Sequence, residues 1–512
     1  MNRPTNKQWL PITLPKRLLA VFLLLLQIFL YAYFIFSSGA FSTATTVVLW
    51  VVGVVAALCV VTRKGESAYK LTWIFFILSL PLFGAFMYLM LMGNTSGLRF
   101  KRRVRESEAH AWPYLKPEEE TEPMTALDER KELRYLSSHV GFPVCGQTDA
   151  AFFPSGEAMF AALKEMLMRA KQYIFLEFFI ISEGEMWGEI LDILKQKAAE
   201  GVTVRLLYDD VGSFLLLPHR YPKMLEKYGI EAKVFNPFVP VLKSEQNNRD
   251  HRKIVVVDGI HAITGGVNLA DEYINRIEKH GHWNDAAVRV SGRAAWSLAV
   301  FFLQMWEVCS KKREELLDFY PKAGFPRFDF CEGAVVPYVD DPLDNEAVGE
   351  QVYLQMIGTA REYVYITTPY LIIDDKMVTA LTSAAKSGVD VCIVVPHHWD
   401  KRVVHATTRT YYWELIASGV RVYEYTPGFI HAKTVVSDDK VATVGTVNFD
   451  YRSLYLHFEC GVFFYDHKTI WDVKSNFLRI LEVSEEIRCQ RARVPFLSRL
   501  WESFLRLLSP IM

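Results

Sequence analysis

Three long hydrophobic runs occupy the first hundred residues. They cover residues 18–36, 45–61 and 71–92. A helix that spans a membrane needs roughly 20 apolar residues, and each run comes close to that length. The first run contains only Gln27 as a strongly polar residue, and Pro81 interrupts the third. The pattern predicts a membrane anchor of two to three transmembrane helices over residues 1–97.

Basic residues flank these runs unevenly. They precede the first run, separate the second from the third, and follow the third, whereas the loop at residues 37–43 has none. The positive-inside rule therefore places the amino terminus and the second loop in the cytoplasm. Three full spans would put the remainder of the chain outside, whereas a re-entrant or interfacial third segment would keep every basic cluster inside. The sequence leaves both arrangements open, and the cluster at residues 99–105 favours the second.

The pattern changes after the third run. Residues 98–135 are polar and acidic and contain several prolines, and we interpret them as a linker. From residue 136 onward, short apolar runs alternate with stretches of helical spacing. Strands are predicted at residues 173–181, 202–208, 251–258, 363–368 and 389–395, and helices at residues 158–170, 186–199, 291–308, 377–387 and 411–418. This alternation predicts α/β layers.

The last segment, residues 483–512, is predicted to be an amphipathic tail. Its apolar residues fall on one face at helical spacing: Leu497, Leu500, Trp501, Phe504, Leu505 and Leu508. Arg499, Glu502 and Arg506 lie off that face. Such a helix either packs on the folded domain or lies on a membrane surface, and the pattern alone leaves both open.

One stretch of the chain is written twice. His251, Lys253, Asp258, Gly265 and Asn268 recur as His431, Lys433, Asp438, Gly445 and Asn448. The offsets from the histidine are +2, +7, +14 and +17 in both copies. Four matched offsets indicate an internal duplication.

The duplicated residues suit chemistry on a phosphodiester. In an extended strand the side chains at i and i+2 point to the same face, so each histidine and its lysine are expected on one face of the strand. Two copies around one cavity provide lysines that neutralise the non-bridging oxygens, one histidine that attacks phosphorus and another that protonates the leaving oxygen. A buried acid on each histidine would orient the ring and support its charged form.

The repeated pattern HxKxxxxD, followed by GGxN in one copy and GTxN in the other, resembles the phospholipase D superfamily. The flanking residues narrow this resemblance to bacterial cardiolipin synthases, over roughly residues 70–482. They are residues 248–253, residues 425–433, and residues 448–453 together with Glu459. The resemblance implies two similar αβα halves, at residues 136–325 and 326–482, packed face to face with both motifs at the interface. An α-helical transmembrane region would precede them, in a multi-pass protein of the bacterial cell membrane.

The resemblance also implies an activity. A phosphatidyl group would pass from one phosphatidylglycerol to a second, giving cardiolipin and glycerol. His251 would form the phosphohistidine, and His431 would act as acid and then as base. No metal and no cofactor are implied, and the partners are membrane phospholipids. The order of the two histidines, the acceptor lipid and the oligomeric state stay open.

The family pattern assigns the site residues by position. The catalytic set is His251, Lys253, Asp258, His431, Lys433 and Asp438, and the supporting set is Asn268, Asp285, Asn448 and Glu459. Asp258 and Asp438 each precede a turn, so a turn-forming role competes with direct participation. Two residues depart from the usual pattern: Thr446, where serine is commoner, and His457, where the family often has asparagine.

Composition helps to weigh the rival functions. The net charge is −1, so no strong basic field attracts nucleic acid, which counts against a nuclease of the same superfamily. Seven scattered cysteines without a CxxC motif argue against a disulfide framework and against a zinc site. A non-catalytic scaffold would be expected to have lost one motif. A hydrolase that releases phosphatidic acid shares every motif and remains the alternative function.

Overall fold

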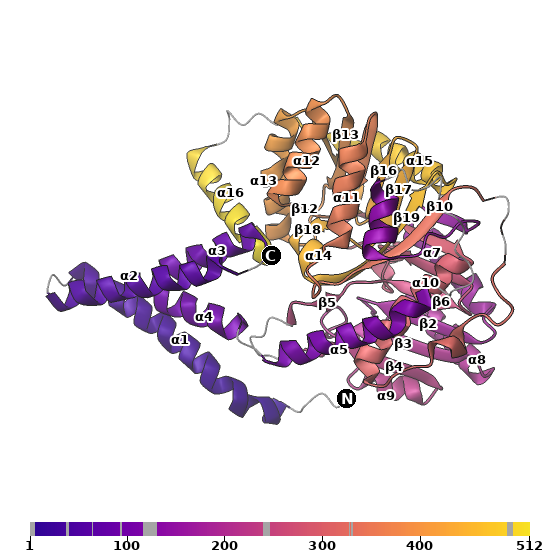
Figure 1. Ribbon diagram of the computed structural model, residues 1–512, viewed down its shortest axis with the longest axis horizontal. Helices are drawn as coiled ribbons and strands as arrows, with labels where there is room; N and C mark the ends of the chain where they lie inside the picture. The colour runs from indigo at the N-terminus through magenta and orange to yellow at the C-terminus, as the bar shows by residue number, and fades with distance from the viewer. Residues whose placement is uncertain are drawn as a thin grey trace. The chain divides into compact units, whose positions relative to one another are not determined.

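The computed structural model describes residues 6–36, 40–63, 65–92, 95–115, 131–238, 246–326, 328, 331–488 and 495–512 (Figure 1). The chain divides into two compact units. The helical unit comprises Met1–Phe100, Phe238–Asn248 and Leu500–Met512, and the α/β unit comprises Lys101–Pro237 and Arg249–Arg499. Each unit is considered by itself.

The three apolar runs of the sequence form four helices in the helical unit. They are α1 (Asn6–Phe36), α2 (Ala40–Val61), α3 (Ser67–Ser79) and α4 (Pro81–Met92). The third run is divided because Pro81 cannot continue the preceding helix and instead begins α4. The side-chain oxygen of Gln27 accepts a hydrogen bond of 3.0 Å from the backbone N–H of Leu82. The one strongly polar residue of the first run therefore satisfies a backbone donor at this break.

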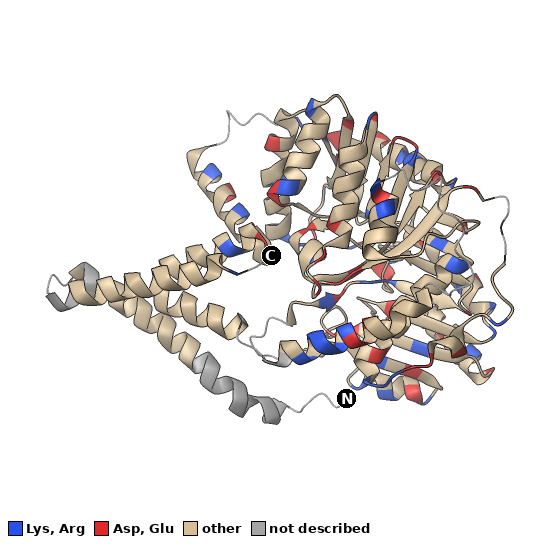
Figure 2. Cartoon of the chain, viewed as in Figure 1, with Lys and Arg blue, Asp and Glu red and all other residues tan. Residues whose placement is uncertain are grey.

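Among the described residues, one helical stretch is long and apolar enough to cross a membrane, Thr43–Val61. Three shorter apolar stretches accompany it: Leu19–Tyr33, Ser67–Ser79 and Pro81–Leu91. Helices α2 and α4 contain no charged residue, as the colouring of Figure 2 shows. The expected two to three spans therefore stay a prediction, since length and composition support one.

The amphipathic tail forms helix α16 (Phe496–Leu508), which ends in a short 3-10 turn at Ser509–Ile511. The hydroxyl of Thr72 in α3 donates a hydrogen bond of 2.7 Å to the carbonyl oxygen of Leu507. Leu505 is buried, whereas Leu497 and Trp501 are exposed. The end of the chain is thus fastened to an apolar helix of its own unit.

The α/β unit contains one sheet for each copy of the duplicated motif. The first has seven strands in the order β1-β9-β7-β6-β2-β3-β4. Its strands are β1 (Asp149–Phe153), β2 (Tyr173–Phe178), β3 (Thr203–Asp209), β4 (Ile230–Phe235), β6 (Ile254–Val257), β7 (His261–Gly265) and β9 (Ala287–Ser291). Its helices are α7 (Gly156–Met168), α8 (Glu185–Ala199), α9 (Tyr221–Glu226) and the buried α10 (Arg293–Ser310).

The second sheet repeats this arrangement in the order β10-β19-β17-β16-β11-β13-β14-β20. Its strands are β10 (Ala334–Asp340), β11 (Tyr363–Thr367), β13 (Asp390–Pro396), β14 (Arg421–Tyr425), β16 (Thr434–Ser437), β17 (Val441–Gly445), β19 (His457–Tyr465) and β20 (Ser484–Glu486). Its helices are α11 (Val348–Thr359), α12 (Asp375–Lys386), α13 (Arg402–Ala417), α14 (Tyr451–Tyr455) and α15 (Thr469–Glu482). The duplication seen in the sequence is therefore a duplication of strand order.

The polar segment predicted to be a linker begins as a helix, α5 (Thr95–Ala111). Val104 and Ala111 are buried, and between them the hydroxyl of Ser107 donates to the carbonyl oxygen of Gln304 and to the Glu307 carboxylate, at 2.7 and 2.9 Å. These three positions recur at helical spacing, so a buried stripe runs through a mostly charged sequence. Composition concealed that stripe. Residues 116–130 of the predicted linker lie outside the described residues.

Asp258 and Asp438 occupy equivalent turns and make the same hydrogen bonds in the two halves. Each has a φ of 53°, in the left-handed region that aspartate tolerates better than most residues. The carboxylate of Asp258 accepts from the backbone N–H groups of Lys171, Gln172 and Tyr173, at 2.7–2.9 Å. Asp438 accepts from Arg361, Glu362 and Tyr363 over the same range. Each carboxylate therefore fastens the motif hairpin to the start of the neighbouring strand.

Replacement of Asp258 by alanine should destabilise the protein without touching the histidines. It removes the acceptor for three N–H groups and places alanine in the left-handed region, so we expect a loss of about 2 kcal/mol or more in the free energy of unfolding. Asp438→Ala should cost a similar amount, since its contacts are the same. The measurement is the midpoint of thermal or denaturant unfolding of the purified protein.

The control for this prediction is Asp192→Ala. Asp192 is exposed and pairs with Lys195, three residues away on helix α8. Such surface pairs contribute about 0.5 kcal/mol or less, so its midpoint should stay near that of the wild type. Equal midpoints for Asp258→Ala and Asp192→Ala would show that the hairpin turn is not held by its carboxylate.

Candidate active site

Two short parallel ladders join the halves and place the duplicated motifs. Strand β5 (Arg249–Asp250) pairs with the start of β19, and β15 (Gly428–Ile430) pairs with β8 (His282–Asn284). Each ladder ends in a bond from a motif histidine. The N–H of His251 donates to the carbonyl oxygen of Phe458 at 2.9 Å, and that of His431 donates to Asn284 at 2.6 Å. Each motif is therefore held by a strand of the other half.

Both HxK triplets were predicted to lie inside strands, and this prediction is wrong by three residues. The regular strands β6 and β16 begin only after the lysines, at Ile254 and Thr434. The apolar run is what joins the sheet of its own half. The triplet itself turns to the opposite half, because the histidine N–H has its partner there.

Each histidine is bonded to the acid that the other half supplies. Nδ1 of His251 lies 2.9 Å from both carboxylate oxygens of Glu459. Nδ1 of His431 lies 2.6 Å from Oδ2 of Asp285. All four side chains are buried. A carboxylate only accepts hydrogen bonds, so a proton on Nδ1 leaves the lone pair of Nε2 available.

The two lysines stand beside their own histidines. The ammonium of Lys253 donates to the carbonyl oxygen of His251 at 2.6 Å. That of Lys433 donates to the carbonyl oxygen of His431 and lies 2.8 Å from its Nδ1. Both lysines are buried and have no aspartate or glutamate as a salt-bridge partner among the described residues. A buried ammonium favours an anionic ligand, so the pair is suited to a phosphate.

Burial lowers the pKa values of both motif histidines and both motif lysines. It lowers the pKa of His251 well below its usual value, with the charges of Lys253 and Lys433 adding to the effect. Burial and Lys433 lower the pKa of His431 to about 4. Burial also lowers the pKa of Lys253 to about 8 and that of Lys433 to about 7. Both imidazoles are therefore neutral at pH 7 and carry a lone pair.

The unequal residues of the two GxxN segments are explained by their acids. A Cβ at Gly266 would lie 2.0 Å from Oδ1 of Asp285, so only glycine fits there. At the matching position the hydroxyl of Thr446 donates to Oε2 of Glu459 and also accepts from the N–H of Cys460. The longer glutamate leaves room for a side chain, and threonine uses that room to hold the carboxylate. This departure from the family pattern is therefore a support for Glu459.

The structure separates the remaining predicted residues. Asp258 and Asp438 lie at the far ends of strands β6 and β16 from the histidines, where their carboxylates hold the turns described above, and their inclusion in the catalytic set stays a prediction. Asn268 is buried, accepts from the N–H of Ile180 and donates to the hydroxyl of Tyr273. The Oδ1 atom of buried Asn448 has no hydrogen-bond partner among the described residues.

Several aromatic residues at the site were not predicted. The ring of Tyr273 meets that of His431 edge-on at 5.4 Å, and the ring of Phe179 meets that of His251 at 5.0 Å. Trp283 lies 5.3 Å from His431, and His457 lies 5.5 Å from His251. His457 is visible in the sequence as an unusual residue. The other three lie outside the repeated motif, and a single sequence offers no signal that separates them from core aromatics.

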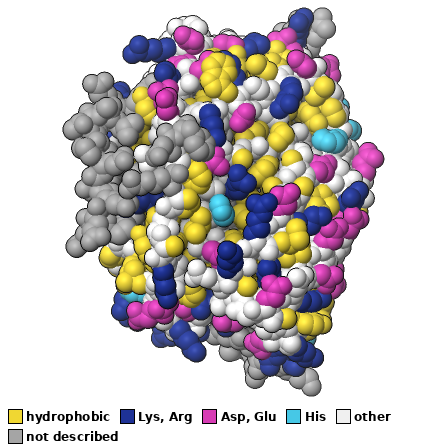
Figure 3. All heavy atoms as spheres, turned by 90° about the vertical axis from the view of Figure 1, so that its right-hand side faces the viewer, with side chains coloured by type: hydrophobic (Ala, Val, Ile, Leu, Met, Phe, Trp, Pro, Cys, Tyr) yellow, Lys and Arg dark blue, Asp and Glu magenta, His cyan; other side chains and the backbone are white. Residues whose placement is uncertain are grey.

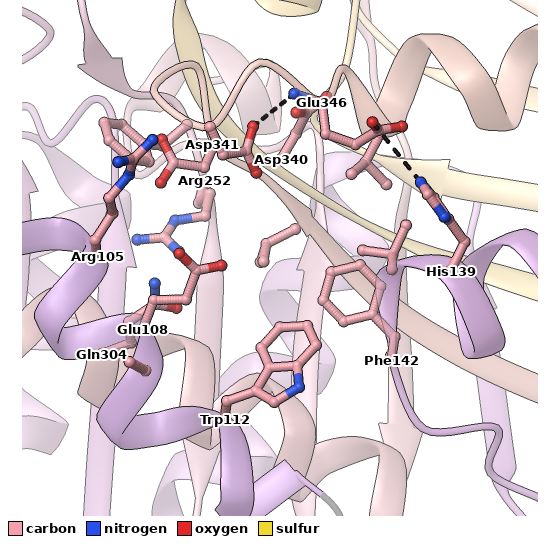
Figure 4. Close-up of a pocket in the computed structure, with 16 residues that line it drawn as sticks. Arg105, Glu108, Trp112, His139, Phe142, Arg252, Gln304, Asp340, Asp341 and Glu346 are labelled. Carbon is pink, nitrogen blue, oxygen red and sulfur yellow. Dashed lines mark hydrogen bonds and ion pairs between the residues drawn. The ribbon is translucent and has the colours of Figure 1, made fainter. Parts of the chain in front are cut away.

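A cavity of about 450 Å³ lies behind the first motif (Figure 4). Arg252 lines this cavity, whereas its sequence neighbours His251 and Lys253 do not. The guanidinium of Arg252 pairs with Glu177 at 2.5 Å and with Asp250 at 3.2 Å. The cavity also has acidic walls, where burial raises the pKa of Asp341 to about 7. It is a separate space, since none of the paired histidines, lysines or acids contributes to its lining.

One face of the molecule carries charges of both signs (Figure 3). Figure 3 shows one face, on which basic and acidic side chains are interspersed with hydrophobic ones. That face offers no continuous basic track for a nucleic acid backbone.

Comparison with known proteins identifies the family. The profile described as "Cardiolipin synthase, PLD-like domain" matches residues 163–306 and 353–481, and a "Phospholipase D-nuclease N-terminal" profile matches residues 48–91. A cardiolipin synthase of Halalkalibacterium halodurans is 34% identical over 93% of this chain and 94% of its own length. Cardiolipin synthase 2 of Bacillus anthracis is 36% identical over 89% of both chains. The chain belongs to the PLD-like cardiolipin synthase family.

The fold agrees with this assignment. The crystal structure of the phosphatidylserine synthase of Haemophilus influenzae superposes with a TM-score of 0.56 at 16% identity, covering 75% of this chain and all of that one. The predicted architecture of two repeated phospholipase D-like α/β halves is confirmed. The chain is an enzyme of the phospholipase D type.

Removal of either acid should slow the reaction. Glu459→Gln and Asp285→Asn each take away the negative charge that orients a histidine and balances its charged form. We expect product formation to fall about 100-fold or more in each variant. The measurement is the rate of product formation by variants whose unfolding midpoints are close to that of the wild type.

The matched control is Asp439→Asn. The Asp439 carboxylate accepts from Lys474 and from the hydroxyl of Tyr363, at the far end of the motif strand from His431. Because those bonds lie at the turn, the rate of this variant should remain within about twofold of the wild type. A rate for Glu459→Gln equal to that of Asp439→Asn would contradict the role given to the cross-half acids.

Proposed function

We propose that this enzyme transfers a phosphatidyl group between two phosphatidylglycerol molecules, giving cardiolipin and glycerol. The observation that supports this most directly is the pair of buried histidines, each bonded to a carboxylate of the opposite half and accompanied by a buried lysine. The relatives named cardiolipin synthase cover about nine-tenths of the chain, including the region before the two sheets.

The first step of the proposed reaction forms a covalent intermediate. Nε2 of His251 attacks the phosphorus of one phosphatidylglycerol, a P–N bond forms, and the P–O bond to the glycerol headgroup breaks. His431 gives its proton to the departing glycerol oxygen. The low pKa of free His431 does not prevent this role, because a bound phosphodiester anion adds negative charge that favours the protonated ring.

The second step reverses the proton transfer. His431, now neutral, takes the proton from a hydroxyl of the second phosphatidylglycerol, whose oxygen attacks phosphorus and displaces His251. One phosphodiester replaces another, so no nucleotide is consumed. Glu459 balances the positive charge of the phosphorylated His251 ring, and the two lysines neutralise charge on the non-bridging oxygens. The reaction therefore requires no resident metal.

The proposed acceptor is a lipid, and the helical unit would anchor the enzyme in the membrane that contains it. We propose that the chain is a multi-pass protein of the bacterial cell membrane, in which helix α2 is joined by the shorter apolar helices. Anchoring at the bilayer concentrates the lipid acceptor near the intermediate, so that transfer competes with hydrolysis by water.

Product analysis tests the proposal. Detergent-purified protein is incubated with phosphatidylglycerol alone, in the presence of a chelator, beside His251→Ala and His431→Ala. We expect cardiolipin and glycerol from the wild type, and less than about one thousandth of that rate from either variant, because each histidine acts in both steps. Lipids are measured by mass spectrometry, and Asp439→Asn serves as the active control.

The products decide between the rival functions. Phosphatidic acid without cardiolipin would identify a hydrolase and contradict the proposed transfer. Loss of cardiolipin on addition of the chelator would contradict a reaction that requires no metal. Full activity of either histidine variant would contradict the paired-histidine mechanism.

Helix α16 is proposed to lie on the membrane surface. Its end is bonded to apolar helix α3, while Phe496, Leu497, Leu500 and Trp501 are exposed on one side. An exposed apolar face beside a membrane helix matches an interfacial helix better than a packed one.

A double change, Leu497→Glu with Trp501→Glu, should weaken activity on bilayers. Charged residues on the buried side of an interfacial helix oppose its insertion, so we expect at least about a fivefold loss on phosphatidylglycerol vesicles and little loss in mixed micelles. The measurement is the ratio of the two rates. Ser498→Glu, on the other side of the helix, should keep the wild-type ratio. An unchanged ratio in the double variant would show that α16 does not bind the membrane.

A further inference from the structure

We propose that His251, His457 and Glu459 form a binding site for Zn²⁺, and that zinc bound there inhibits the enzyme. The site would take a divalent transition metal as an inhibitory ligand, distinct from any metal required for the reaction. The inhibition part of this inference rests on the proposed function, in which His251 is the nucleophile. The binding part stands on geometry alone.

The three side chains present a suitable set of atoms. One ligand atom from each lies within 4.8 Å of the other two, and all three residues are buried. Nδ1 of His251 is 2.9 Å from Glu459, and Nδ1 of His457 is 3.7 Å from Oε1 of the same carboxylate. Zinc bonds of about 2.0–2.2 Å place tetrahedral ligands roughly 3.5 Å apart, so small side-chain movements complete the site.

His457 is the observation that points to a ligand. Its side chain is only 9% exposed, and neither ring nitrogen has a hydrogen-bond partner among the described residues. A buried polar group without a partner costs free energy, and most native buried groups avoid that cost. Nδ1 faces Glu459 from 3.7 Å, a distance too long for a hydrogen bond and well suited to a shared metal ion.

The duplication supplies an internal comparison. Trp283 holds the position in the first half, two residues before Asp285, that His457 holds two residues before Glu459. The ring of Trp283 lies 5.3 Å from His431, and the ring of His457 lies 5.5 Å from His251. An indole cannot bind zinc, so the same framework carries a third ligand beside only one of its histidines.

Zinc bound at this site would inactivate the nucleophile His251 by changing the tautomer of its ring. In the free site the proton of neutral His251 is on Nδ1, which donates to Glu459, and the lone pair is on Nε2. When Nδ1 binds zinc, the proton of the neutral ring moves to Nε2. No proton is gained or lost, yet the atom that attacks phosphorus no longer has a lone pair. Glu459 is also occupied by the metal and cannot balance a phosphorylated ring.

Binding is tested first, without reference to activity. The full chain is purified in detergent without a histidine tag, stripped with chelator and titrated with Zn²⁺ by calorimetry, and with Co²⁺ by its visible absorption. We expect one tight site in the wild type, with a tetrahedral cobalt spectrum. His457→Asn removes one of three ligands and should weaken that site at least about 10-fold.

Inhibition is then measured for each protein relative to its own metal-free rate. The zinc concentration for half-inhibition should rise at least about 10-fold in His457→Asn, in step with binding. His261→Asn is the matched control, because His261 is half-buried on strand β7 and its side chain bonds to Ser291. That variant should bind zinc and respond to it as the wild type does.

Each outcome decides the inference. Equal zinc affinity in the wild type and His457→Asn would overturn it, as would a wild type that binds no zinc at micromolar concentration. Binding that depends on His457 without inhibition would overturn the tautomer argument and the inhibitory role. A wild type that forms no product from phosphatidylglycerol would count against the proposed function, and the zinc site would then be judged by binding alone.

Discussion

The exchange of partners between the two halves is the constraint on which the site depends. His251 reaches the acid of the second half, and His431 reaches the acid of the first. The backbone makes the same exchange, through the pairing of β5 with β19 and of β15 with β8. Neither half therefore contains both a motif histidine and the carboxylate bonded to it, and the paired geometry exists only when both sheets are folded and joined.

Burial gives this arrangement its chemical character. Two histidines, two lysines and two acids are removed from water in one small region, and each isolated charge there would cost several kcal/mol. The structure meets part of that cost by pairing histidines with acids and part by lowering the pKa values of the lysines. A phosphate would complete the balance, because it brings the negative charge that the two ammonium groups lack. The site is thus organised for an anion before the anion arrives.

Much of the fold was available from the sequence, for a physical reason. Apolar runs such as Ile254–Val257 form strands that are buried on both faces, and such runs predict strands directly. The matched offsets of the two motifs showed the duplication. The triplets ahead of those strands were misjudged, because their partners belong to the other half and no local pattern reports such a partner. The stripe of α5 was missed because three buried positions are hidden among many charged ones.

The site divides in the same way. Asp285 and Glu459 were predicted from the family pattern, yet which histidine each one contacts depends on how the two halves pack and is not visible in the sequence. Thr446 and His457 were visible as unusual residues, but their meaning required the positions of Glu459 and His251. Asp258 and Asp438 belong to the motif, and only the structure shows that their carboxylates serve the hairpin turns.

The reciprocal ladders have a consequence for how such a protein can diversify. Two identical copies of one half could make both ladders at once, since each contact would be repeated about a two-fold axis. Joining the copies in a single chain frees each from that identity. Arg252 of one copy then corresponds to Ala432 of the other, Gly266 to Thr446, and Trp283 to His457. A symmetric framework thereby acquires two halves with different residues at equivalent positions. In a reaction that has a donor step and an acceptor step, each half can then be specialised for one step.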